Sequence, residues 1–213
     1  MIQTAVMFSM NGNRIARFEK VASGISGIAQ EDVILPVRAT SGSAGYDIRT
    51  PFAFTLEPGQ STAICTGLRC FMQPGWVLMI FPRSGLGRKY RLRLDNTTGI
   101  IDSDYYYSQN QGHIIVPITN CGDKTLTLAK GESFCQGVFV PFGITYDDNA
   151  TAVRDGGFGS TDIKKEQKRS NCYEMSRLRI RRKQSRRQPP FARRQHDPPP
   201  PRVPGLRQTV HHL

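Results

Sequence analysis

The sequence of 213 residues lacks the features that mark several common protein classes. No stretch approaches the ~20 consecutive apolar residues that a membrane helix needs. The first residues show neither the basic region nor the long apolar run of a secretory signal. There are five cysteines but no CxxC pair, and no second pair or nearby histidine completes a zinc site around Cys65 and Cys70. We therefore expect a cytoplasmic protein whose cysteines are buried or free thiols.

An excess of acidic residues is also absent, and the positive charge is confined to one end of the chain. Residues 1–162 contain 14 Lys and Arg against 14 Asp and Glu, whereas residues 163–213 contain 15 against 3 and so account for the whole net charge of +12. This second segment also holds half of the 14 prolines. Its composition predicts a disordered basic tail. The tail is expected either to contact nucleic acid or an acidic partner weakly or to have no role.

The rest of the chain has the pattern of short β-strands. Runs rich in β-branched and aromatic residues alternate with turn signals, and the clearest of them cover residues 61–68, 76–81, 113–119 and 134–142. No helix-period stripe of useful length occurs in residues 30–162. The pattern predicts an all-β sandwich, barrel or jelly roll.

Four segments follow from composition and pattern. They are an N-terminal segment of unassigned structure (1–34), a β core (35–146), a polar glycine-rich arm (147–162) and the basic tail (163–213). The arm has too few apolar residues to add to a core, so we expect it to be mobile.

Glycine- and hydroxyl-rich loops lie between the expected strands. Their sequences are SGSAGYD (41–47), PRSGLG (82–87), NTTGIIDSDYY (96–106), KGESFCQG (130–137) and RDGGFGSTD (154–162). Each loop alone is typical of a plain turn, but together they offer backbone N–H groups, hydroxyls and two arginines, which suit a polyphosphate. The helix-linked phosphate motifs GxxxxGK[ST] and GxGxxG are absent, which favours a phosphate site built on β loops.

Two acidic residues and one aromatic residue add to this pattern. Asp102 and Asp104 alternate, so on an extended chain both carboxylates face one side. A carboxylate beside phosphates and a divalent ion can hold a water molecule as a nucleophile, although an isolated Asp-Ser-Asp is more often a turn cap. Phe158 lies between glycines, where it could stack on a flat ring.

In this order the loops closely resemble the five motifs of the trimeric dUTP diphosphatase (dUTPase) family, over residues 35–162. The resemblance implies a jelly-roll homotrimer with active sites at the subunit junctions. It also implies hydrolysis of dUTP to dUMP and pyrophosphate, with Mg²⁺ held mainly by the substrate phosphates and water rather than directly by the protein.

The resemblance further implies a role for each matching residue in the nucleoside part of the site. Asp102 would orient and deprotonate the water that attacks the α-phosphorus. Tyr105 would pack against the deoxyribose and leave no space for a 2′-hydroxyl. Asn96, with the backbone of a tight hairpin through Gly99 and Ile100, would read the uracil edge.

For the phosphates, the resemblance implies contacts from Ser84, Gly85 and Gln136, with Arg83 supported by Asp47. The arm would close as a lid, with Phe158 stacked on the uracil, and would supply further contacts from Arg154, Gly159, Ser160 and Thr161.

The chain departs from the family pattern at three places. Six residues, 106–111, precede Gly112 where the family has one, which predicts a longer loop beside the nucleoside pocket. Ser133 replaces a common Arg. The arm has one residue fewer between Arg154 and its glycines, and ends in Asp162 instead of Gly.

Two alternatives stay open at this point. A dCTP deaminase-like enzyme of the same fold would need a Glu general base. A nucleotide-gated binding partner of a regulator is suggested by phage members of the family.

Overall fold

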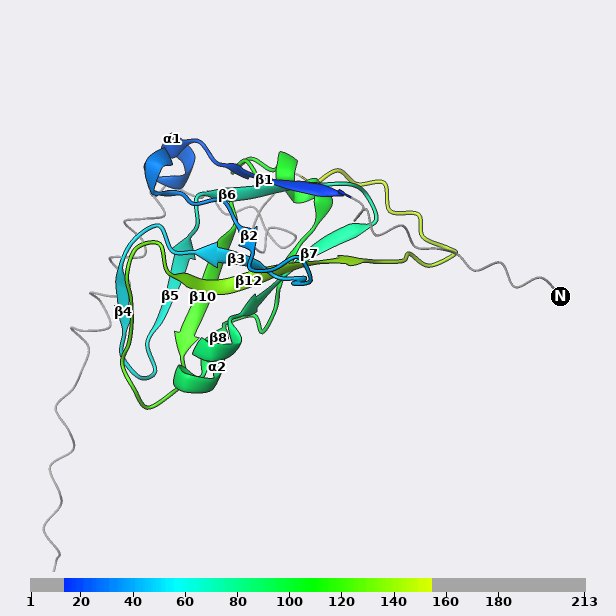
Figure 1. Ribbon diagram of the computed structural model, residues 1–213. Helices are drawn as coiled ribbons and strands as arrows, with labels where there is room; N and C mark the ends of the chain where they lie inside the picture. Colours follow the sequence, from blue (N-terminus) through cyan, green and yellow to red (C-terminus); the bar gives the residue numbers. More distant parts are fainter. Residues whose placement is uncertain (1–13, 155–213) are drawn as a thin grey trace, which may run out of the picture.

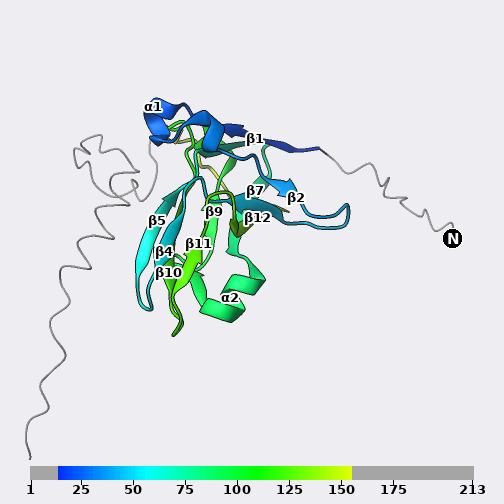
Figure 2. The ribbon, with the colours of Figure 1, turned by 60° about the vertical axis from the view of Figure 1, so that its left-hand side comes forward.

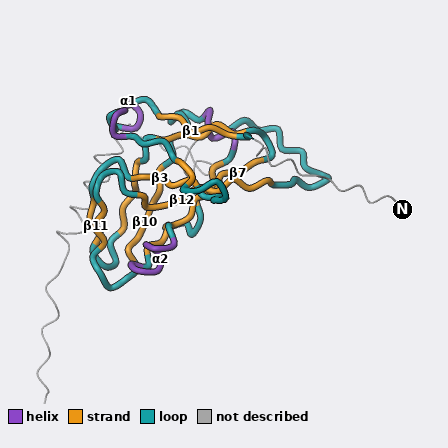
Figure 3. Tube along the Cα trace, viewed as in Figure 1, coloured by secondary structure: helices purple, strands orange, loops and turns teal. Residues whose placement is uncertain are grey.

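The computed structural model describes residues 14–154 (Figure 1). Within this range the chain is almost entirely β-structure, as expected, with only short helices (Figure 3). The strands are β1 (Ala16–Lys20), β2 (Val37–Arg38), β3 (Tyr46–Arg49), β4 (Phe54–Leu56), β5 (Ser61–Cys65), β6 (Leu68–Met72), β7 (Trp76–Pro82), β8 (Leu92–Leu94), β9 (Gly99–Ile101), β10 (Ile115–Asn120), β11 (Leu126–Leu128) and β12 (Ser133–Pro141). The helices are α1 (Ser23–Ser26), α2 (Ser84–Tyr90) and the 3₁₀-helices η1 (Gln30–Asp32) and η2 (Ser103–Tyr107). None of the described helices is long and apolar enough to cross a membrane.

The four runs expected to be strands are strands, with one division. The run 61–68 is split into β5 and the start of β6, because the chain turns at Gly67, where φ is +71°. A Cβ at this glycine would also lie 2.5 Å from a methyl carbon of Val33. Both the left-handed backbone and the close packing therefore require glycine at this position.

The strands form an antiparallel jelly-roll-like arrangement of small sheets. A five-stranded sheet has the order β2-β3-β12-β7-β9, and a three-stranded sheet has the order β5-β10-β8. Two further sheets are the strand pairs β1-β6 and β4-β11 (Figures 1 and 2). Alternate residues point inward, as in β10, where Val116, Ile118 and Asn120 are buried. The inward apolar side chains from both larger sheets form one core, including Ile64, Leu78, Ile80, Leu92, Leu94, Val116, Ile118 and Cys135.

The segment left unassigned by the sequence contributes to this body. Strand β1 pairs with β6 over its whole length, and Val21, Ile28 and Val33 are buried. The Val21 N–H donates to the Gly67 carbonyl over 2.8 Å. In Figure 1, α1, β1 and β6 lie at one end of the body and α2 lies at the other.

Helix α2 occupies most of the PRSGLG segment, which the sequence presents as a loop. Gly85 and Gly87 lower helix propensity, and seven residues are too few to show a periodic apolar stripe. Packing of Leu86 and Tyr90 against the core holds the helix. Arg88 and Lys89 lie in its last turn, where positive charge is favourable.

Candidate active site

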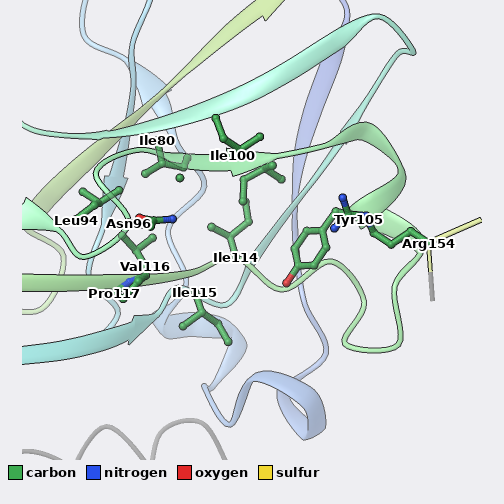
Figure 4. A pocket seen from close by; sticks show the side chains of 12 residues that line it. Ile80, Leu94, Asn96, Ile100, Tyr105, Ile114, Ile115, Val116, Pro117 and Arg154 are labelled. Carbon is green, nitrogen blue, oxygen red and sulfur yellow. The ribbon is translucent and has the colours of Figure 1, made fainter. Parts of the chain in front are cut away.

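A half-open cavity of about 200 Å³ lies between β7, β9 and β10. Its walls are mostly apolar, and Figure 4 shows Asn96 at one end and Tyr105 with Arg154 at the other. The lining residues are Ile80, Leu94, Asn96, Gly99, Ile100, Ile101, Tyr105, Ile114, Ile115, Val116, Pro117 and Arg154. The structure thus brings together Asn96, Gly99, Ile100, Tyr105 and Arg154, which the sequence analysis selected.

The Tyr105 ring is fixed in the cavity wall by both hydrogen bonds of its hydroxyl. The hydroxyl donates to the His113 carbonyl over 2.8 Å and accepts from Asn110 Nδ2 over 2.8 Å. Burial raises the pKa of Tyr105, so the hydroxyl stays protonated near neutral pH. The ring is therefore a rigid wall rather than a titrating group.

Asp102 and Asp104 both bind Arg154, although the chain between them is not extended as we expected. Asp102 is the N-cap residue of η2, and Asp104 lies in the first turn of this helix. The backbone turns here, with the Tyr105 N–H donating to the Asp102 carbonyl over 3.2 Å and the Ser108 N–H to the Tyr105 carbonyl over 3.1 Å. The Asp102 side chain makes no capping hydrogen bond, so the turn-cap interpretation is not supported.

One guanidinium holds the two carboxylates side by side. Arg154 Nε lies 2.9 Å from Asp104 Oδ1, and Arg154 Nη2 contacts Asp102 Oδ2. Their side chains are 44% and 53% exposed, for Asp102 and Asp104 respectively. Water therefore reaches both carboxylates, as a general base for hydrolysis requires.

The segment around Asn96 is a turn between two sheets rather than the tight hairpin we expected. β8 pairs with β10, and β9 pairs with β7, so the flanking strands belong to different sheets. Thr97 has a φ of +63°, and its N–H donates to the Leu94 carbonyl over 3.0 Å. At Gly99 a Cβ would lie 3.0 Å from the Ile80 Cβ. The turn therefore presents backbone close to the cavity, where a side chain at position 99 would crowd Ile80.

A second group of site residues lies around the start of α2. Arg83 Nε is 3.3 Å from Asp47 Oδ1, which is the contact expected between these residues. Asp47 and Gln136 are paired across β3 and β12, and Gln136 Nε2 lies 3.5 Å from the Pro82 carbonyl. A Cβ at Gly45 would lie 2.5 Å from Gln136 Oε1, so glycine leaves room for this side chain.

The first helical hydrogen bond of α2 runs from the Gly87 N–H to the Arg83 carbonyl, over 2.9 Å. The N–H groups of Ser84 and Gly85 precede it, so they have no acceptor within the helix. Both residues are exposed. These N–H groups are available to an anion.

The two groups of residues are separated along β7. Leu78 pairs with Ile101, so Asp102 lies level with Val77, whereas Arg83 and Ser84 follow the far end of the strand at Pro82. The five steps along the chain from Val77 to Pro82 span about 17 Å at the usual rise of a strand. Within one chain, Asp102 and the start of α2 therefore do not form a single site.

Several expected site residues lie outside the described part of the chain, namely Phe158, Gly159, Ser160 and Thr161. The basic tail, 163–213, also lies outside it.

The sequence analysis did not select Asn110 and His113, which hold Tyr105. His113 is buried, and its Nε2 accepts from the Gly67 N–H over 3.0 Å. Burial lowers the pKa of His113 to about 4, so its ring is neutral at pH 7. Neither residue belongs to a recognisable motif; the only signal in the sequence was the length of the segment after Tyr105.

The described residues include no group of three or more His, Cys, Asp and Glu that could enclose a metal ion. The paired carboxylates of Asp102 and Asp104 nevertheless suit Mg²⁺, which usually keeps several waters and binds one or two carboxylates together with substrate phosphates. Among the cysteines, Cys70 and Cys135 are buried thiols and Cys121 is an exposed thiol. Burial raises the pKa of Cys70 to about 12, which makes it unreactive.

The family model described as dUTPase matches residues 31–162, more than half of the chain. The chain belongs to the dUTPase family. It is 42% identical over 130 residues to the deoxyuridine 5′-triphosphate nucleotidohydrolase of Lactococcus lactis subsp. lactis. The match covers 60% of this chain and 87% of that protein.

Two solved structures also resemble this dUTPase-family chain. The crystal structure of the Streptococcus mutans dUTPase is 38% identical, with a TM-score of 0.53, and the match covers 61% of this chain and 98% of that one. The dUTPase of Staphylococcus bacteriophage 80alpha is 20% identical, with a TM-score of 0.52, over 65% of this chain and 97% of that one. The second likeness shows the shared fold alone.

Proposed function

We propose that this dUTPase-family chain hydrolyses dUTP to dUMP and pyrophosphate in the cytoplasm. The observation that carries the proposal is the water-accessible carboxylate of Asp102, level with the Tyr105 end of a cavity whose other end is formed by Asn96. A uracil base at Asn96 and a deoxyribose against Tyr105 place the α-phosphorus towards Asp102.

The described side chains have separate tasks in this reaction. Asp102 orients the attacking water and accepts its proton. Tyr105 fills the space that a 2′-hydroxyl would need, and its two hydrogen bonds prevent the ring from moving aside. The turn at Asn96, with backbone at Gly99 and Ile100, contacts the uracil edge.

The reaction depends on positioning and on neutralising charge rather than on covalent chemistry. Bound Mg²⁺ would balance part of the triphosphate charge and order nearby water. Asp102 and Asp104 are the described carboxylates placed to hold its water ligands. Arg154 binds these carboxylates in this structure and would bind the outer phosphates, together with Ser160 and Thr161, when the triphosphate is present.

A homotrimer would unite the two groups of site residues. The cavity of about 200 Å³ is smaller than the roughly 300–1,000 Å³ of typical ligand pockets. The N–H groups at Ser84 and Gly85, with Arg83 and Gln136, lie too far from Asp102 to contact the same triphosphate within one chain. We therefore propose that the start of α2 from one subunit completes the site around Asp102 of a neighbour.

The deaminase alternative finds no support in the described cavity, because no Glu lines it. The carboxylates beside the cavity belong to Asp102 and Asp104, and an aspartate that holds a water molecule suits attack on phosphorus.

The proposal is tested by pyrophosphate release from dUTP, dTTP, dCTP and UTP in the presence of Mg²⁺, together with the oligomer mass in solution. We expect a trimer that releases pyrophosphate from dUTP much faster than from the other nucleotides. Chelation of divalent ions should abolish most of the activity. Ammonia release from dCTP would support the deaminase alternative, and failure to release pyrophosphate from dUTP would overturn the proposal.

A further inference from the structure

The loop 106–111, which is longer than in the family pattern, is attached to the strand pair β1-β6. Tyr106 Oη donates to Glu19 Oε2 over 2.7 Å, and the Tyr106 ring lies edge-on to the Phe71 ring with 5.5 Å between centroids. At the other end of the loop, Gln111 Oε1 accepts from the Ala22 N–H over 3.2 Å. The loop is therefore held at both ends by the N-terminal part of the chain.

The outer face of β1-β6 is suited to this contact. Glu19 pairs with Arg69 across the two strands, and Arg69 Nη2 lies 2.7 Å from Glu19 Oε2. The Arg69 guanidinium also lies 4.5 Å from the centre of the Tyr106 ring. One face of β1-β6 therefore makes three contacts with Tyr106: a hydrogen bond to its hydroxyl, an edge-on aromatic contact and a cation–π contact. Together they hold the Tyr106 side chain more strongly than one exposed contact would.

The same loop reaches Tyr105 in the cavity wall. Asn110 Nδ2 donates to the Tyr105 hydroxyl, while Asn110 Oδ1 accepts from the Gly112 N–H over 3.2 Å. Gly112 has a φ of +69°, and a Cβ there would lie 2.8 Å from the Tyr106 Cα, so glycine is required to close the loop. Contacts therefore run from Glu19 to Tyr106, from the Tyr106 backbone to the Gly112 that packs against it, and from Gly112 through Asn110 to the Tyr105 hydroxyl.

We propose that the loop 106–111 is a brace in which Asn110 and Tyr106 are positioning residues that hold the Tyr105 ring and so set how strongly the site rejects ribose. The inference rests on the proposed function, because Tyr105 is assigned there to the deoxyribose. Because the His113 carbonyl and Asn110 Nδ2 hold the Tyr105 hydroxyl, the ring cannot move away to admit a 2′-hydroxyl. Without the brace, the ring gains freedom, and UTP is accepted more readily.

The test compares kcat/KM for dUTP and for UTP in the full-length protein. Asn110→Ala should reduce the dUTP preference by about three- to tenfold, the range of one neutral hydrogen bond. Tyr106→Phe, which keeps the ring and removes only the hydroxyl contact with Glu19, should reduce the preference in the same direction by a smaller factor. In both variants kcat for dUTP should change less than the preference does.

Tyr107→Phe is the matched control, because it makes the same chemical change one residue away. Its side chain is 72% exposed, and within residues 14–154 the structure gives its hydroxyl no hydrogen bond. The dUTP preference of this variant should equal that of the wild type. Thermal unfolding of each variant shows whether the fold is retained.

A double variant separates positioning from a general loss of structure. If Asn110 acts through the Tyr105 hydroxyl, then Asn110→Ala should have no further effect on the preference in a Tyr105→Phe background. Additive effects, or an unchanged preference in Asn110→Ala, would overturn the brace. A wild-type protein that does not hydrolyse dUTP would instead overturn the proposed function, and the two failures are therefore distinguishable.

Discussion

The two groups of site residues differ in how the chain holds them. Around the cavity, Tyr105 is buried and hydrogen-bonded, and the apolar walls belong to strands of the core. At the start of α2, Arg83, Ser84 and Gly85 are exposed, and Arg83 has a single ion pair with Asp47. In the proposed function, one chain builds the surface for the nucleoside, whereas the surface for the phosphates depends on how two chains are placed against each other.

The largest effect is expected from the carboxylate next to the cavity. Asp102→Asn should lower the turnover of dUTP by at least ~10²-fold, because the amide cannot accept the proton of the attacking water. Affinity for a non-hydrolysable dUTP analogue should change little, since the cavity and the start of α2 are untouched. Pyrophosphate release and equilibrium binding measure these two quantities.

Asp104→Asn is the matched control for this variant. Asp104 shares Arg154 with Asp102 but is the more exposed of the two carboxylates, and we expect its loss to lower turnover far less. Equal losses in the two variants would contradict the assignment of Asp102 as the general base.

The proposed division of the site between chains predicts complementation. Asp102→Asn removes the general base beside the cavity. Ser84→Asp places a carboxylate where the phosphates should bind, and aspartate still suits the first turn of a helix. Each variant alone should be nearly inactive. Mixed trimers formed by co-expression should recover about a quarter of the wild-type activity, because that fraction of sites combines two intact halves. No recovery would show that both halves act within one chain.

The last prediction concerns stability and His113, whose carbonyl accepts the hydrogen bond of the Tyr105 hydroxyl. His113 has its pKa lowered to about 4 by burial, whereas the unfolded chain takes up a proton near the ordinary value of 6.5. The unfolded state therefore binds more protons between these values, and the free energy of unfolding falls as the pH is lowered from 6.5 towards 4. The loss should be on the order of 2–3 kcal/mol.

His113→Gln tests this loss, because its amide oxygen can still accept from the Gly67 N–H without taking up a proton. Denaturant unfolding across this pH range, at constant protein concentration, should show a flatter pH dependence in the variant than in the wild type. The same slope in both proteins would mean that other groups cause the loss.

The sequence predicted the strands and the local motifs more completely than their arrangement. Runs such as 134–142 are rich in β-branched and aromatic residues and became strands, and Asn96, Tyr105 and Arg154 lie at one cavity because loops of one family pattern converge there. Strand β1 and helix α2 were missed, because five and seven residues carry little periodic signal.

Other features depend on tertiary pairing and were not accessible from local patterns. The distance between Asp102 and Ser84 follows from the register of β7 with β9, and the support of Tyr105 by Asn110 follows from the fold of an insertion. The expected hairpin at Asn96 was wrong because its two strands pair with different neighbours.

Strand β7 limits where the chain can gain or lose residues. Within one chain, β7 sets the distance between Asp102, which lies level with Val77, and the start of α2, which follows Pro82. Adding or deleting one residue would shift this span by about 3.3 Å and reverse the facing of every side chain beyond the change. In the proposed trimer the shift would occur in every subunit, so we expect length changes to be tolerated in loops but not in this strand.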